Sequence, residues 1–164
     1  MSRWLLLAAL AFTGCRREQS APPPGPLVGL VTDVGGRGDQ SFNDSALRGL
    51  EAWAAGVHQV SGTYRPLADD ARAVPQELAA RIHSLGIKPL VVQSRAQEDY
   101  QPNLQLLVDM AADLTIGVGF MLENAVEAVA LQNPGAQFLL IDSPLLDAKG
   151  RARALPNVRT VVFR

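Results

Sequence analysis

The chain has 164 residues, of which 48% are apolar and 19% are charged, and its net charge is −1. This length and composition suit one domain with a substantial core and exclude an intrinsically disordered chain. The near-neutral charge gives no reason to expect a nucleic-acid partner, because domains that bind nucleic acids normally carry a basic patch. The single cysteine excludes a disulfide framework and a cysteine-based zinc site.

The first residues have the order of a secretory signal. A cationic start, Met1–Arg3, precedes the uncharged apolar run Trp4–Phe12, and small residues then lead to Cys15. The apolar run is too short to span a bilayer, which takes about 20 residues. The pattern resembles a bacterial lipoprotein signal, in which residues 1–14 are removed and Cys15 is acylated by fatty acids such as palmitate. The alternative is an ordinary cleaved signal with Cys15 incidental, and either reading predicts export.

A proline-rich segment follows the cysteine. Ser20–Pro26 reads SAPPPGP, and three successive prolines favour an extended, hydrated spacer. We therefore expect residues 15–26 to tether a folded domain, residues 27–164, to the membrane. A leader segment without a role is the alternative.

From Leu27 onward, short apolar runs alternate with helical patterns. The runs that predict strands are Leu27–Val31, Leu90–Val92, Leu114–Val118, Phe138–Ile141 and Val158–Phe163, with a weaker one at Val60–Tyr64. The patterns that predict helices are Phe42–Val57, Pro75–Leu85, Pro102–Ala111 and Met121–Gln132. This alternation predicts right-handed crossovers and a doubly wound α/β domain with a mostly parallel sheet.

The loop after the first predicted strand is the best candidate for a binding site, because ligands of such sheets collect at the carboxyl ends of strands. The loop lacks the Gly-Lys-Ser/Thr of phosphate-binding loops. Phe42 offers a stacking face, and Ser41 and Asn43 offer hydrogen-bonding groups or cap the following helix. In the alternative reading, Phe42 anchors the loop in the core and Asn43 only caps.

Two further loops lie at predicted carboxyl ends. The glycines of Gly117–Phe120 let a ligand approach the start of a helix, and tight packing between strand and helix explains them equally well. Asp142, which ends the Phe138–Ile141 strand, either binds a ligand hydroxyl or caps the local backbone.

The sequence contains few groups suited to catalysis. His58 and His83 fall on predicted helices or their ends, and neither has a partner at metal-ligand spacing. No Gly-x-Ser-x-Gly elbow is present. We therefore expect no catalytic residues, no metal and no cofactor.

Four segments together resemble the basic membrane protein family, the lipid-anchored substrate-binding components of ABC importers, which include purine nucleoside receptors. They read VGLVTDVGGRGDQSFNDSALRGLE, EDYQPNLQLLVDMAADLTIGVGF, NPGAQFLLID and LPNVRTVVFR, and they span about Leu27–Arg164. The resemblance implies one lobe of a type I periplasmic-binding-protein fold. It also implies a nucleoside-like ligand, an ABC permease as partner, and a lipid-anchored location facing the periplasm or the cell exterior.

Matching the family motifs position by position implies a set of ligand-binding residues. These are Asp33, Ser41, Phe42, Asn43, Gly119 and Phe120. By this resemblance, Asp33 supplies the acidic group at the end of the first strand, Phe42 stacks on the base, and Gly119-Phe120 lines the cleft.

Family members carry a second lobe, whereas this chain resembles the first lobe only. We therefore expect apolar surface to be exposed where crossover segments pack in those proteins. Two alternatives to an importer component stay open, namely a ligand-sensing module for signalling and a nucleoside-processing enzyme on the same fold.

Overall fold

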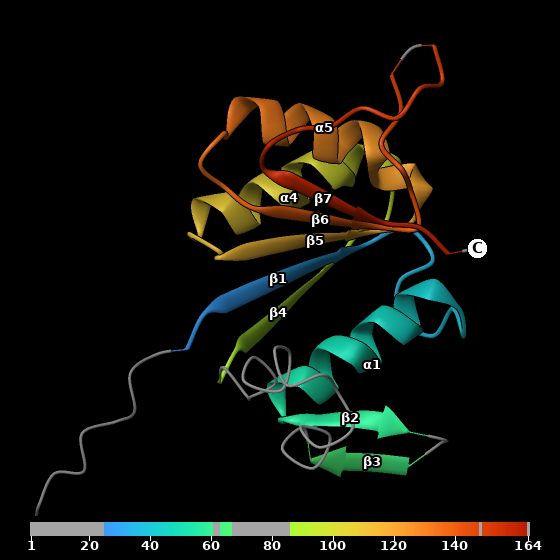
Figure 1. The fold of residues 1–164 in the computed structure, drawn as a ribbon, viewed down its shortest axis with the longest axis vertical. Coiled ribbons are helices and arrows are strands. Elements are labelled where there is room, and N and C mark those ends of the chain that lie inside the picture. The colour runs from blue at the N-terminus through green and yellow to red at the C-terminus, as the bar shows by residue number, and fades with distance from the viewer. Residues whose placement is uncertain (1–24, 61–62, 67–85, 148, 164) are drawn as a thin grey trace, which may run out of the picture.

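The computed structural model describes residues 25–60, 63–66, 86–147 and 149–163. Its centre is a five-stranded sheet in the order β4-β1-β5-β6-β7 (Figure 1). The strands are β1 (Leu27–Thr32), β4 (Lys88–Gln93), β5 (Leu114–Val118), β6 (Phe138–Ile141) and β7 (Val158–Val161). Every neighbouring pair in this sheet is parallel, which confirms the predicted α/β class.

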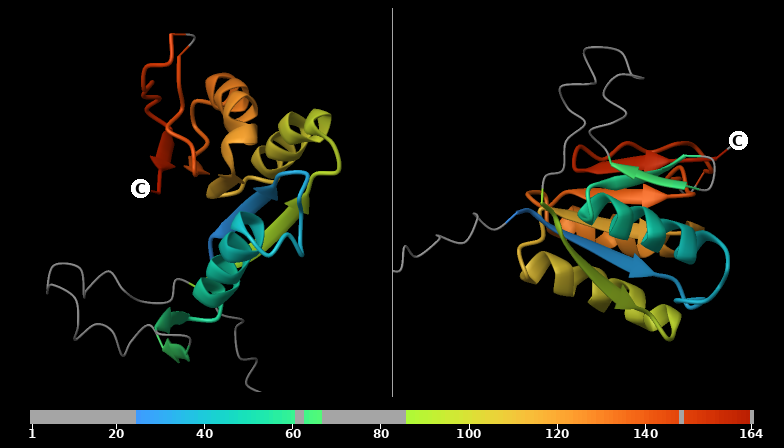
Figure 2. Two further views of the ribbon diagram at one scale, coloured as in Figure 1. Left: turned by 90° about the vertical axis from the view of Figure 1, so that its right-hand side faces the viewer. Right: turned by 90° about the horizontal axis from the view of Figure 1, so that it is seen from below.

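Helices cover both faces of the sheet, as the views in Figures 1 and 2 show. Helix α1 (Phe42–Ala54) lies on one face, and α4 (Tyr100–Asp109) and α5 (Glu123–Gln132) lie on the other. Short 3-10 turns, η1 (Gln97–Asp99) and η2 (Phe120–Leu122), lead into α4 and α5. The doubly wound arrangement is therefore confirmed, with β5, α4 and α5 close to their predicted bounds.

The apolar runs of the strands explain this layering, because a parallel sheet must bury both faces. Neighbouring residues of β1 point to opposite sides: Leu30 packs in the core on the α1 side, and Val31 packs in the core under α4 and α5. Both side chains are almost fully buried. Pro89, which cannot donate to a strand ladder, lies in β4 at the edge of the sheet.

The strand order contains one reversal of direction. The chain passes from β1 to its neighbour β4, and then crosses back through α4 to β5 on the other side of β1. The reversal therefore lies between β1 and β5. In open α/β sheets, the crevice outside the strand ends at such a reversal is the usual place for a ligand.

The region after α1 differs from the prediction. The helix ends at Ala54, because Gly56 adopts a positive φ of 71° and its N–H donates to the carbonyl of Trp53. Two strands follow, β2 (Val57–Val60) and β3 (Thr63–Pro66), which form a separate antiparallel pair. The predicted helical end at Val57 and the single strand at Val60–Tyr64 are therefore wrong. His58 lies on a strand and not on a helix.

Other predictions fall outside the described residues or need a smaller correction. The signal, Cys15, most of the tether, the Pro75–Leu85 helix and His83 lie outside the described residues. The last strand ends at Val161, so Phe163 leaves the sheet. In the described parts of the chain, no helix has the length and apolar character needed to cross a bilayer.

Candidate functional site

The loops after β1 and β5 meet at the carboxyl edge of the sheet, on the two sides of the reversal in strand order. Gly119 follows β5 with a positive φ of 94°. A Cβ atom at Gly119 would lie 3.5 Å from Oδ2 of Asp33, which follows β1. All six residues proposed from the sequence lie on these two loops or at the first turn of α1.

The carboxylate of Asp33 is fixed through one oxygen. Its Oδ1 accepts hydrogen bonds from the backbone N–H of Gly35 at 2.7 Å and from Nδ2 of Asn43 at 2.6 Å. Its Oδ2 accepts no hydrogen bond from the described residues and faces Gly119. The half-buried side chain therefore offers one oriented acceptor at the edge of the sheet.

Asn43 is buried and connects the two ends of the β1–α1 loop. Its exposed fraction is 2%, and its Oδ1 accepts a hydrogen bond from the backbone N–H of Asp33. Its Nδ2 donates to Oδ1 of Asp33 and to Oδ2 of Asp39. Because both N–H groups are used within the protein, Asn43 acts on the site by positioning Asp33.

Asp39 caps α1, a role that the sequence reading gave to Ser41 or Asn43. Its Oδ1 accepts from the backbone N–H groups of Ser41 and Asp44, and its Oδ2 accepts from that of Asn43. Ser41 is exposed at the N-cap position and makes no capping bond with its side chain. Hydrogen bonds to Asp39, above all that from the Ser41 N–H, lower the pKa of its carboxyl group. The only sequence feature that could have indicated this capping role is the position of Asp39, an acidic residue shortly before the predicted helix.

Two aromatic rings at this edge are open to solvent. Phe42 is 49% exposed and Phe120 is 70% exposed. The reading in which Phe42 anchors the loop in the core is therefore wrong. The ring of Phe42 stacks on that of Phe163, a residue that the sequence analysis did not connect with the site.

Tyr100, the first residue of α4, is buried and contacts the β1–α1 loop. It is 3% exposed, and its Oη accepts a hydrogen bond from the backbone N–H of Val34 at 3.3 Å. Burial raises the pKa of the Tyr100 hydroxyl, and the nearby Asp33 charge adds to the effect. Tyr100 is not identifiable as a site residue from the sequence, because a tyrosine at the start of a helix is indistinguishable from any other partly buried aromatic.

The third loop contributes one further acidic group to the same edge. Asp142 has a positive φ of 65°, and its N–H donates to the carbonyl of Val161. Its carboxylate makes no hydrogen bond within the described structure, so the capping interpretation is wrong. The adjoining Ser143 is buried and donates to Glu123, which fixes the path of this loop.

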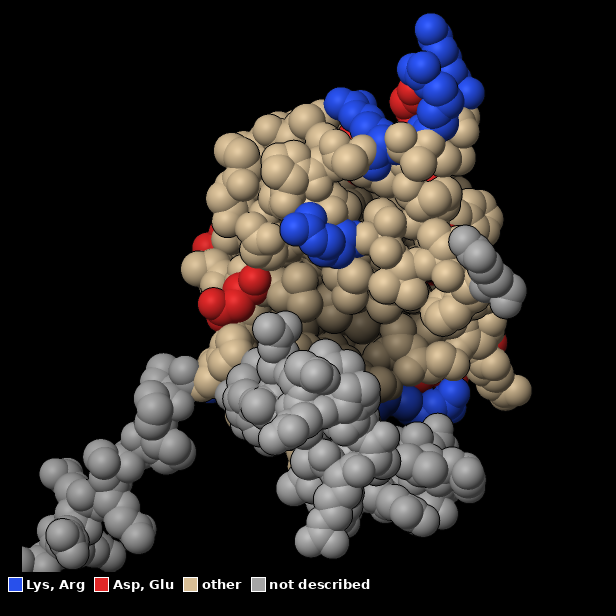
Figure 3. All heavy atoms as spheres, viewed as in Figure 1, with Lys and Arg blue, Asp and Glu red and all other residues tan. Residues whose placement is uncertain are grey.

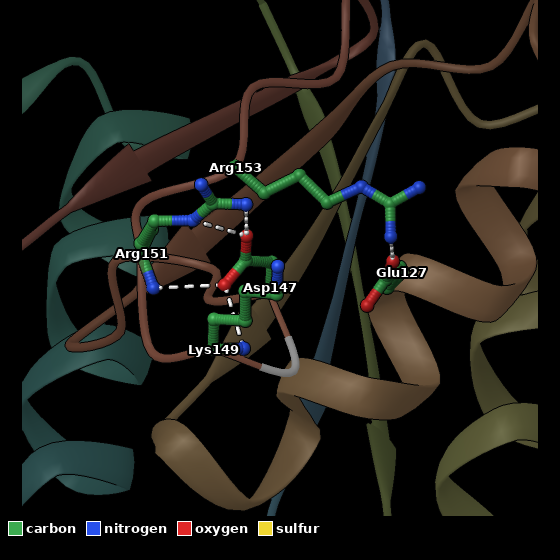
Figure 4. Close-up of polar contacts among 5 residues, drawn as sticks. All are labelled: Glu127, Asp147, Lys149, Arg151 and Arg153. Carbon is green, nitrogen blue, oxygen red and sulfur yellow. Dashed lines mark hydrogen bonds and ion pairs between the residues drawn. The ribbon is translucent and has the colours of Figure 1, made fainter.

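The rest of the β6–β7 connection is held by ionic contacts, shown in Figure 4. Asp147 pairs with Arg151, whose N–H and guanidinium lower the pKa of the Asp147 carboxyl group. Arg153 pairs with Glu127 on α5. The basic side chains of this projecting loop stand out at the top of Figure 3.

The arrangement suits binding of a small polar ligand with a planar group. The unpaired Oδ2 of Asp33 lies beside the buried Gly119, which has no side chain to block a ligand. Two exposed phenyl rings lie at the same edge of the sheet. Within the described residues, no three His, Cys, Asp or Glu side chains are grouped to hold a metal ion. His58 lies in the separate β2–β3 pair, at the opposite end of α1 from Phe42 (Figure 1).

Comparison with known proteins gives matches over most of the chain. Residues 27–164 match the family model described as ABC transporter substrate-binding protein PnrA-like. The chain is 28% identical over 151 residues to the ABC transporter nucleoside-binding protein BmpA of Lactococcus lactis subsp. cremoris, covering 88% of this chain and 36% of that protein. It is 33% identical over 138 residues to an uncharacterized lipoprotein of Pyrococcus horikoshii, covering 84% and 26%.

A solved structure supports the same relationship. An ABC transporter solute-binding protein from Aeropyrum pernix K1 matches with a TM-score of 0.54 at 25% identity, over 85% of this chain and 29% of that one. The chain thus spans only between 26% and 36% of the length of these three proteins.

Proposed function

Since the chain belongs to the family of PnrA-like substrate-binding proteins of ABC transporters, we propose that it binds a purine nucleoside and delivers it to an ABC permease. The family match confirms the resemblance to the basic membrane protein family. The Lactococcus relative is named as a nucleoside-binding protein, which supports the choice of ligand. The proposed role is binding without turnover.

One observation carries the proposal: the loops after β1 and β5, which with the first turn of α1 hold all the proposed ligand-binding residues, flank the reversal in strand order. The free Oδ2 of Asp33 is an acceptor for a hydroxyl or N–H group of a nucleoside. The exposed ring of Phe42 is a stacking surface for the base, a contact worth about 1–3 kcal/mol.

The other residues complete the proposed site. Phe120 lines it from the β5 side, and Gly119 leaves the space that a side chain would fill. Asn43 orients Asp33, and the exposed Ser41 lies beside Phe42 as a further polar group.

Calorimetric titration with guanosine, adenosine, inosine and cytidine tests the proposal. We expect binding of the purine nucleosides without release of free base. Replacing Phe42→Ala removes the stacking surface and weakens binding by about 5- to 150-fold, the equivalent of 1–3 kcal/mol. Replacing Asp33→Asn removes the charged acceptor and weakens binding by at least about tenfold.

A matched control is Met110→Ala, which removes a side chain as exposed as Phe42, at 49%, from the C-terminal end of α4. This variant should bind as the unmodified protein does. If no nucleoside gives heat or a thermal shift, the ligand class is wrong. Release of hypoxanthine from inosine would instead support an enzyme.

We also propose that the chain is exported and held at the membrane by a lipid on Cys15. Residues 1–14 would be the signal and residues 15–26 the tether to the domain 27–164. The lipoprotein name of the Pyrococcus relative supports an anchored, extracytoplasmic location.

Expression with labelled palmitate tests the anchor. The unmodified chain should incorporate label and partition into the detergent phase of a two-phase extraction. Cys15→Ser should lose both properties, whereas Ser20→Ala in the proposed tether should keep them. Equal partitioning of the Cys15→Ser protein would refute the anchor and leave the ligand proposal unaffected.

A further inference from the structure

Phe163 reaches the candidate site from the far edge of the sheet. It lies two residues beyond β7, which is separated from β1 by β5 and β6. Its ring nevertheless contacts that of Phe42, with centroids 6.2 Å apart and ring planes inclined by 27°. The segment after β7 must therefore extend from the far edge of the sheet to the first turn of α1.

This contact leaves part of the Phe42 ring open. Phe42 keeps an exposed fraction of 49% although Phe163 stacks on it. A ring covered on one side and still half exposed has its other side and edge available. Phe163 is itself 60% exposed, so the contact contributes little to the core.

We propose that Phe163 is a positioning residue for the ligand, an inference that rests on the proposed function. By stacking on one face of Phe42, it keeps that ring in the orientation in which the open face receives a planar base. An exposed side chain that is already ordered loses less conformational entropy when a ligand binds. Phe163 thus acts through Phe42 and does not touch the ligand.

The test is a double-mutant cycle on purine nucleoside binding, measured by calorimetry on the whole chain. Phe163→Ala should weaken binding by about two- to tenfold, the equivalent of ordering one side chain. In a Phe42→Leu background, the same substitution should have no further effect, because no ring remains to be oriented. Phe163→Tyr should restore binding, whereas Phe163→Leu, which keeps apolar bulk without a ring, should not.

A neighbouring residue provides the control. Val162 is 50% exposed and takes no part in the ring contact, so Val162→Ala should leave binding unchanged. Thermal unfolding of each variant should match that of the unmodified protein, because the substituted side chains are exposed.

Three results would overturn the inference while the proposed function stands. Unchanged binding by Phe163→Ala would show that Phe42 needs no support. Tighter binding would show that Phe163 covers the face that the ligand uses. An equal loss in the Phe42→Leu background would show direct contact with the ligand. If the unmodified chain binds no nucleoside, the proposed function fails, and this inference fails with it.

Discussion

Among single residues, one carboxylate holds both the start of α1 and the buried side chain of Asn43. Asp39 accepts hydrogen bonds from three backbone N–H groups and from Nδ2 of Asn43. Asn43 in turn holds Asp33, so the orientation of the proposed ligand acceptor depends on a side chain that is not itself at the ligand.

This dependence predicts a specific response to acid. Because the pKa of Asp39 is lower in the folded protein, its contribution to stability is complete above its ordinary value of about 3.9. The contribution is lost as the pH falls further, through the folded-state pKa. We expect Asp39→Asn to lower the midpoint of thermal unfolding at pH 7 and to make the decrease below pH 4 shallower. Part of the decrease should remain in this variant, because the pKa of Asp147 is also lowered in the folded protein.

The control is Glu98→Gln, which alters an exposed carboxylate that makes no hydrogen bond in the described structure. Its melting curve should follow that of the unmodified protein between pH 3 and pH 7. An identical acid response in the Asp39→Asn protein would mean that this carboxylate does not hold the loop.

At the level of helices and strands, two glycines have opposite effects on the stability of the fold. A Cβ on Gly29 in β1 would come within 2.9 Å of Cγ of Leu107, a fully buried side chain of α4. Gly49 lies inside α1, and a Cβ there would meet nothing within 4 Å. The first glycine permits close packing between strand and helix, whereas the second only weakens the helix.

The two alanine substitutions should therefore change stability in opposite directions. Gly29→Ala should lower the free energy of unfolding by about 1–3 kcal/mol, because Leu107 has no room to move. Gly49→Ala should raise it by about 0.4–1 kcal/mol, since alanine restricts the unfolded chain and favours the helix. Urea unfolding followed by circular dichroism measures both. Equal effects of the two substitutions would contradict the packing of α4 against β1.

At the scale of the whole molecule, the described helices cover the two faces of the sheet unequally. Two helices pack on one face, and α1 alone packs on the other. An apolar hollow of about 250 Å³ lies between α1 and the sheet. It is lined by Leu30, Ala46, Gly49, Leu50, Trp53, Leu114, Ile116, Leu139 and Ile141.

Adjacent leucines of β6 test this asymmetry, because they point to opposite faces. Leu140 is fully buried under α5, and Leu139 is partly exposed on the α1 side. Leu140→Ala should cost about 2–5 kcal/mol of the free energy of unfolding, as deletion in a closed core does. Leu139→Ala should cost less than half as much. A larger cost at Leu139, measured by the same urea titration, would show that the α1 face is the better packed one.

Most of the helices and strands, and part of the candidate site, could be predicted from the residue order. The apolar runs and helical periodicity predicted the five parallel strands and the helices α1, α4 and α5. A strand buried on both faces is a continuous apolar run, and a helix with one buried face repeats its apolar residues every three to four positions. The loops after the strands, together with the family resemblance, were enough to identify Asp33, Phe42 and Gly119. These loops combine glycine, acidic and aromatic residues close together in the sequence.

The contacts between residues far apart in the chain could be found only in the folded protein. The order of the strands placed the loops after β1 and β5 beside each other, and the stacking of Phe163 on Phe42 brought the segment after β7 to the first turn of α1. The capping of α1 by Asp39 depended on a turn with Gln40 at a positive φ of 52°, which residue types do not predict. Such contacts depend on the path of the backbone in space, which the pattern of apolar and polar residues along the chain does not specify.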